Sequence, residues 1–80
     1  MNEIMLSPQV NFLDPRNPSS PFQYRQQAAQ WCWKFIEENA TPAGGLWEVK
    51  INDGRKDYYY FEKTKEDMFN SIKHHFSGLL

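Results

Sequence analysis

The segment Ser20–Asn39 constrains the fold most, because its sequence predicts one helix with an unusually wide apolar face. Ser20 suits the N-cap, Pro21 suits the first helical position, and Gln23 completes a capping box. A proline and two glycines follow Asn39, so the helix should end there. On a helical wheel the apolar residues cover an arc of roughly 200°, which is wider than the stripe that a surface helix needs. We therefore expect this helix to be covered on more than one side, or to form an interface.

The second half of the chain predicts a hairpin and a further helix. Leu46–Ile51 and Asp57–Glu62 are rich in β-branched and aromatic residues, and the turn-forming sequence between them contains Asp53-Gly54. Thr64 opens a second capping box, and the apolar spacing after it predicts a helix from about Lys65 to Ser77. The expected fold is α+β, with two helices packed on an antiparallel β-hairpin in the order α-β-β-α.

The length of the hairpin loop decides which side chains share a face of the hairpin. A two- or four-residue loop would put the first and third tyrosines of the run Tyr58–Tyr60 beside the apolar residues of the first strand. A three-residue loop, with Gly54 left-handed, would put the middle tyrosine and Phe61 there instead. We expect the three-residue loop, because it separates apolar from polar side chains better. The inner face would then consist of Trp47, Val49, Ile51, Tyr59 and Phe61. The outer face would consist of Glu48, Lys50, Tyr58 and Tyr60.

Residues 1–19 contain three prolines and are expected to form an extended or irregular segment ahead of a compact domain of residues 20–80. Several apolar residues in this segment require burial, so it is not expected to be a simple tail. Val10 and Phe12 alternate with polar residues, which makes Gln9–Leu13 a candidate third strand. The alternative is that the segment wraps the helix as a coil.

Composition limits the classes of function. The 80 residues include 13 aromatic ones (3 Trp, 4 Tyr and 6 Phe), and the net charge is −1. This balance argues against a protein that binds nucleic acid mainly through phosphate contacts. The single cysteine, Cys32, cannot form an internal disulfide, which favours a reducing compartment, and we expect a cytoplasmic protein. No apolar run reaches the length of a membrane span, and no signal peptide is apparent.

The sequence contains no catalytic or metal-binding signature, so we expect neither an enzyme nor a bound metal or cofactor. His74 and His75 are neighbours on a predicted helix and point about 100° apart, so they cannot chelate one metal together. Glu37 and Glu38 diverge in the same way, whereas a general acid–base pair must converge. We expect Cys32 to be a buried structural thiol rather than a nucleophile.

The best candidate binding surface is the outer face of the hairpin. We expect Tyr58 and Tyr60 on this face, with Lys50, Arg55 and Lys56 at or near the turn. Exposed tyrosines suit a protein partner, because each offers a large contact area and a polar group. They also suit nucleic acid, by base stacking combined with phosphate contacts. The alternative to either role is ordinary cross-strand packing in an exposed sheet, or cover from the N-terminal segment.

Arg25 falls inside the apolar arc of the first helix. It either extends its charged group to water along an apolar stem or contacts a partner. Together these features predict a non-enzymatic protein-binding module, such as a small accessory or inhibitor protein. The expected partner is another protein, nucleic acid is the second choice, and self-association through the wide helix is a further alternative.

The run from Leu46 to Lys65 is similar to the first two strands of a WW domain. It contains a Trp-Glu pair, a turn with Asp-Gly-Arg, three consecutive tyrosines and a Thr-Lys pair. Together with the helix after it, the run also resembles the arm-type DNA-binding module of tyrosine recombinases. The first resemblance implies binding of proline-rich peptides and the second implies binding of DNA. The second Trp and the closing Pro of the WW domain are absent, and we carry no function over from either family.

Overall fold

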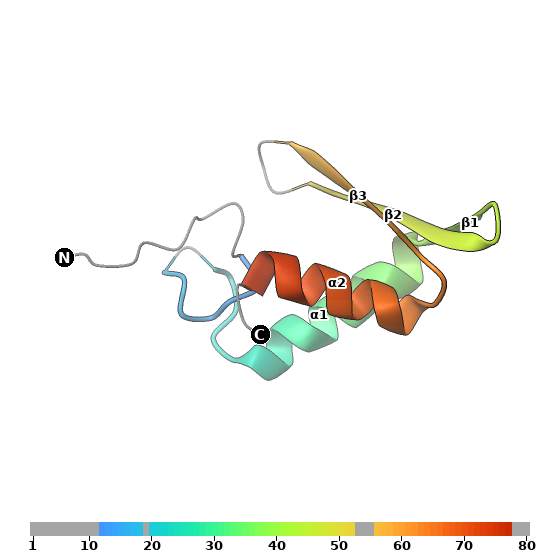
Figure 1. The fold of residues 1–80 in the computed structure, drawn as a ribbon. Coiled ribbons are helices and arrows are strands. Elements are labelled where there is room, and N and C mark those ends of the chain that lie inside the picture. Colours follow the sequence, from blue (N-terminus) through green and yellow to red (C-terminus); the bar gives the residue numbers. More distant parts are fainter. Residues whose placement is uncertain (1–11, 19, 53–55, 78–80) are drawn as a thin grey trace.

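The computed structural model describes residues 12–18, 20–52 and 56–77, which form a helix, a three-stranded sheet and a second helix (Figure 1). The elements are α1 (Arg25–Asn39), β1 (Thr41–Ala43), β2 (Leu46–Asn52), β3 (Asp57–Glu62) and α2 (Lys65–Ser77). The strands are antiparallel in the order β1-β2-β3, and both helices lie on the same side of the sheet. The predicted α+β fold is confirmed, with a third strand added.

Helix α1 begins later than the sequence predicts, because Tyr24 rather than Ser20 is its N-cap. The hydroxyl of Ser20 instead donates a hydrogen bond to the carbonyl oxygen of Phe12 at 2.6 Å. The side-chain oxygen of Gln27 accepts the backbone N–H of Tyr24 at 3.2 Å, which satisfies a donor at the helix start. Ser20 therefore holds the N-terminal segment against the helix rather than capping it. The predicted end at Asn39 is confirmed.

The third strand of the described sheet is β1, which precedes β2. Gly44 and Gly45 have φ angles of 61° and 85°, the left-handed pair that a two-residue type I′ turn requires. This turn joins β1 to β2 and places Ala43 opposite Leu46. Within the candidate segment, residues 9–11 lie outside the described residues, and residues 12 and 13 form a turn.

The predicted three-residue loop between β2 and β3 is wrong. The two strands pair without interruption up to Asn52 and Asp57, so residues 53–56 form a four-residue connection. The pairs that decide which face the tyrosines occupy are Val49 with Tyr60 and Ile51 with Tyr58. Val49 and Ile51 are each 2% exposed, so both tyrosines share the core-facing side of the sheet. Tyr59 and Phe61 consequently face away from the core.

Helix α2 supplies the centre of the core and matches its predicted bounds. Its fully buried side chains are Met68, Ile72 and Phe76. Ile36 and Cys32 of α1 are buried beside them. The predicted cap is also present, since Oγ1 of Thr64 accepts the backbone N–H of Asp67 at 3.0 Å.

The N-terminal segment, residues 12–18, packs against both helices. The backbone N–H of Leu13 donates to the carbonyl oxygen of Phe76 at 3.2 Å, and the Leu13 side chain is buried. The ring of Phe12 meets Trp31 and Phe76 edge-on, at centroid distances of 5.5 and 5.0 Å. These contacts cover part of the wide apolar face of α1, as the sequence predicts.

Candidate functional site

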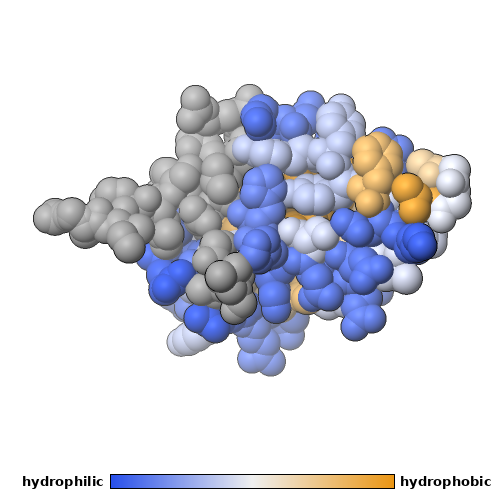
Figure 2. Space-filling model, in the orientation of Figure 1, coloured by the Kyte–Doolittle hydropathy of each residue, from blue (hydrophilic) through white to orange (hydrophobic). Residues whose placement is uncertain are grey.

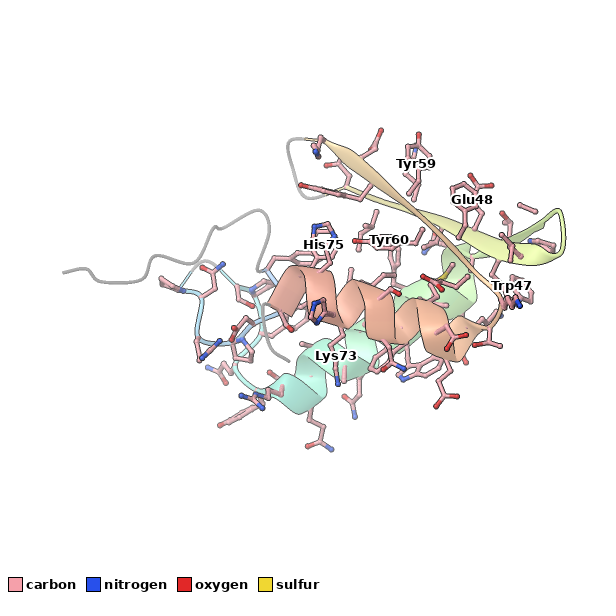
Figure 3. The ribbon with its side chains drawn as sticks, in the orientation of Figure 1. Trp47, Glu48, Tyr59, Tyr60, Lys73 and His75 are labelled. Carbon is pink, nitrogen blue, oxygen red and sulfur yellow. The ribbon has the colours of Figure 1, made fainter. Side chains whose placement is uncertain are left out.

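The clearest candidate surface is the face of the sheet that is turned away from the helices. Tyr59 and Phe61 project from β3 on this face and are 57% and 50% exposed. The strand register sets Tyr59 opposite Lys50 and Phe61 opposite Glu48. Figure 3 shows Tyr59 and Glu48 pointing away from the helices, whereas Tyr60 points toward α2.

We call this surface the outer sheet face. It consists of Thr41, Ala43, Leu46, Glu48, Lys50, Tyr59 and Phe61. Figure 2 shows apolar side chains gathered at the end of the sheet that lies near the β1–β2 turn. Phe61 and the partly exposed pair of Ala43 and Leu46 belong to the apolar part of this face. The face therefore combines aromatic and aliphatic area with one carboxylate and one ammonium group.

The structure places Tyr58 and Tyr60 on the opposite face from the one predicted. Both are half-buried between the sheet and α2. The Tyr58 ring lies edge-on to His75 and Phe76, at centroid distances of 4.9 and 5.2 Å. The hydroxyl of Tyr60 forms a hydrogen bond with Nδ1 of His75, and burial raises the pKa of this tyrosine above its ordinary value. These two tyrosines join β3 to α2 rather than forming an exposed surface.

The predicted basic residues are not gathered at one site. Lys50 lies on the outer sheet face. The Nζ atom of Lys56 is 4.9 Å from the centre of the Tyr58 ring, and Arg55 lies outside the described residues. Arg25 is exposed at the first residue of α1, at the end of that helix far from the sheet (Figure 1). Of the predicted basic residues that lie in the described part of the chain, Lys50 alone is brought to the exposed aromatic residues.

A concavity of about 330 Å³ lies between the first half of α1 and the last part of α2. Its lining includes the small side chains Ala28 and Ala29, together with Arg25 and Lys73. Cys32 also lines it but is 1% exposed, and burial raises the pKa of its thiol to about 12. The thiol is therefore protonated near neutral pH and is not activated as a nucleophile.

Among residues 12–18, 20–52 and 56–77, no group of three or more histidine, cysteine, aspartate or glutamate side chains is arranged to hold a metal ion. His74 and His75 diverge on α2, and His75 is engaged with Tyr60. In the same part of the chain, neither helix is long and apolar enough to span a membrane.

The comparisons with known proteins give no relative. No protein-family model matches the chain, and no match was found among curated proteins or solved structures. Neither the WW domain nor the recombinase module that the hairpin sequence resembles is supported by a family match.

Tyr59 and Phe61 are the residues that the sequence pattern assigns to the wrong face. The signal that would have found them is the alternative loop length, since a four-residue loop turns both outward. Their exposure follows from that register alone, because β3 alternates strictly between half-buried and exposed residues.

Proposed function

We propose that this chain is a protein-binding module whose contact surface is the outer sheet face. The observation that carries the proposal is the exposure of Tyr59 and Phe61, two large aromatic side chains on one face of one strand. Burial of such side chains against a partner is favourable, and aromatic residues are enriched among those that dominate the energy of protein interfaces. The neighbouring Leu46 and Ala43 add aliphatic area.

The scaffold beneath this face supports the same function. β3 is paired along its length with β2, and its inward residues Tyr58 and Tyr60 pack on His75 and Phe76 of α2. The outward side chains are thus carried on a strand that is fixed on two sides. A partner would lose little backbone entropy from this chain on binding, because the contact surface is already ordered.

The charges near the aromatic residues favour a protein over nucleic acid. Glu48 lies opposite Phe61, and Asp57 pairs with Asn52 at the end of the same face. A phosphate backbone that passes over the outer sheet face would meet the carboxylate of Glu48, and Asp57 adds a second carboxylate just beyond the end of that face. The single positive charge of Lys50 does not offset these carboxylates, because surfaces that bind nucleic acid are strongly positive.

A small accessory or inhibitor protein, which acts by covering the surface of its partner, is the kind of module that we propose. Balanced charge and exposed aromatic residues support this role. We further propose a cytoplasmic location, because a single unpaired cysteine is typical of reducing compartments. Nucleic-acid binding by stacking on Tyr59 and Phe61 is the alternative that the experiment must separate.

A pull-down from lysate tests the proposal, with and without nuclease and at low and high salt. The baits are the wild-type chain, the double variant Tyr59→Ala/Phe61→Ala, and Tyr24→Ala as a matched control. Tyr24 is 64% exposed but lies at the start of α1, away from the sheet. A defined protein retained by the wild type and by Tyr24→Ala, and lost by the double variant, is the expected result.

Two outcomes would contradict the proposal. Recovery of nucleic acid that disappears at high salt would indicate the alternative, because phosphate contacts weaken steeply as salt rises. Equal recovery of the same protein by the double variant and by Tyr24→Ala would show that the outer sheet face is not the contact surface.

A further inference from the structure

We propose that a second copy of this chain pairs with the outer edge of β3, so that two sheets join into one continuous sheet across a two-fold axis. The proposal goes beyond the function proposed above, because it concerns the backbone edge of the strand and needs no other partner. It depends on four features of β3: its length, its regularity, the position of α2, and the order of its side chains.

The two edges of the sheet differ in how they are protected. β1 is three residues long and contains Pro42, which lacks a backbone donor, and both features discourage pairing with another chain. β3 has six residues, pairs with β2 without a bulge, and contains no proline, glycine or lysine within Asp57–Glu62. β3 is therefore the edge suited to strand addition.

Helix α2 leaves room beside this edge. The ring of Phe69 stacks on Trp33 of α1 at a centroid distance of 4.7 Å, which fixes the flank of α2 that faces α1. Its hydrogen bonds with β3 come from the other side of the helix: Ser71 donates to Glu62 at 2.8 Å, and His75 is bonded to Tyr60. The ring of Phe76, close to the Phe69 side, also packs on Tyr58 at a centroid distance of 5.2 Å. β3 thus lies over α2, and its hydrogen bonds come from the side of the helix that is turned away from Phe69. We infer that α2 lies inward of the strand edge rather than beyond it.

The side chains of β3 select one antiparallel register. Inward residues must face inward residues across the joint, so a symmetric pair is centred on Tyr59 or on Tyr60. Centring on Tyr60 sets Asp57 opposite Lys63 of the second copy and Tyr59 opposite Phe61. Opposite charges and aromatic pairs are both favourable across strands. Centring on Tyr59 would instead set the carboxylate of Asp57 against the Phe61 ring. We therefore infer the register centred on Tyr60.

Sedimentation equilibrium of the purified full chain tests this proposal without any partner. The mean mass should rise from 9.5 kDa toward twice that value as concentration approaches about 1 mM, where even a weak dimer is populated. Asp57→Lys and Lys63→Asp should each weaken association about tenfold, because two-fold symmetry introduces each repulsion twice. Combining both substitutions in one chain should restore association. Lys50→Asp, on the outer sheet face but not at the edge, is the matched control and should change nothing.

A chain that stays monomeric up to the highest concentration would overturn the proposal. Failure of the combined charge exchange to restore association would overturn it as well. So would equal loss of association in Lys50→Asp and Lys63→Asp, since the contact would then lie on the outer sheet face. Asp57 accepts a hydrogen bond from the Asn52 side chain at 2.8 Å, so circular dichroism must show that Asp57→Lys is folded. If Asp57→Lys is not folded, Lys63→Asp still tests the proposal, because this substitution leaves the bond between Asn52 and Asp57 in place.

Discussion

The hydroxyl of Tyr60 in β3 forms a hydrogen bond with Nδ1 of His75 in α2. Burial raises the pKa of Tyr60, so its phenol keeps its proton near neutral pH. The bond lies in a half-buried position and joins the sheet to the helix beneath it. The same strand thereby holds one tyrosine as a structural link and presents the next, Tyr59, to solvent.

Tyr60→Phe should lower the free energy of unfolding by about 1 kcal/mol, because it removes one hydrogen bond and leaves Nδ1 of His75 without its partner. Urea denaturation of the variant measures the change. Tyr59→Phe is the control and should leave stability unchanged, since Tyr59 is 57% exposed on the outer sheet face. Equal effects of the two substitutions would show that the bond contributes nothing.

The register of the hairpin gives a second pair of variants. Tyr58→Ala should cost about 2–3 kcal/mol, because the ring packs on His75 and Phe76 opposite the buried Ile51. Tyr59→Ala should cost no more than about 0.5 kcal/mol, as is usual for exposed positions. The reverse order of the two effects, in the same denaturation measurement, would favour the three-residue loop.

The ion pair of Asp14 and Arg16 should make the stability of the fold sensitive to acid pH. Asp14 is fully buried, and the guanidinium of Arg16, 2.7 Å away, holds the pKa of that carboxyl below its ordinary value of 3.8. A lowered pKa in the folded state adds stability that is present above pH 3.8 and is lost as pH falls through the folded value. Asp14→Asn should therefore cost about 2 kcal/mol at neutral pH.

The difference between wild type and Asp14→Asn should narrow as pH falls below 3.8, because the wild-type carboxyl is then protonated as well. Thermal unfolding followed from neutral to acid pH measures this difference. Glu37→Gln, at an exposed position of α1, is the control. A difference that stays constant with pH would contradict the role of the charge.

The buried thiol of Cys32 should make the stability of the fold sensitive to alkaline pH. Burial raises the pKa of its thiol from 9.0 to about 12, so between these values the unfolded chain loses a proton that the folded chain keeps. The free energy of unfolding should fall with rising pH by up to about 1.4 kcal/mol per pH unit in this interval. Cys32→Ala should have a lower free energy of unfolding at neutral pH, and this free energy should fall less steeply with rising pH than that of the wild type. Identical slopes in wild type and variant would contradict the prediction.

Substitutions at Gly44 test the turn that joins β1 to β2. Its φ angle is 61° and no atom lies within 4 Å of the place that a Cβ would occupy, so a substitution here meets backbone strain rather than a steric clash. Gly44→Val should cost about 1–2 kcal/mol, whereas Gly44→Asn should cost much less, because asparagine accepts this conformation in type I′ turns. Denaturant midpoints of the two variants provide the comparison. Equal stability would exclude a type I′ turn.

The parts of the fold that the sequence predicts well are set by neighbouring residues. The capping pattern of Thr64 and Asp67 fixes the start of α2 within one turn of chain. The sequence places the start of α1 too early, because Ser20 has an equally good hydrogen-bond partner in Phe12. That contact depends on how the N-terminal segment folds back on the helix, and local sequence does not contain this information.

The sequence predicts the hairpin that carries the candidate site, but it assigns the tyrosines of that hairpin to the wrong faces. The run Tyr58–Phe61 places aromatic residues on both faces of the strand, so hydrophobic pattern alone cannot select the register. The selection comes from His75 and Phe76, which receive two of the tyrosines between the sheet and α2. Lys50 does lie on the outer face of the hairpin, but the aromatic residues on that face are Tyr59 and Phe61.

The hydrogen bond from Leu13 to Phe76 holds two segments side by side that are 63 residues apart in the sequence, residues 12–18 and the last turn of α2. A chain in which two such distant positions are neighbours accepts a covalent link between them without distortion of the fold. It can also be permuted, by linking residues near these two positions and opening the chain elsewhere. The four-residue connection between β2 and β3, far along the sequence from this junction, is the natural place for the new ends.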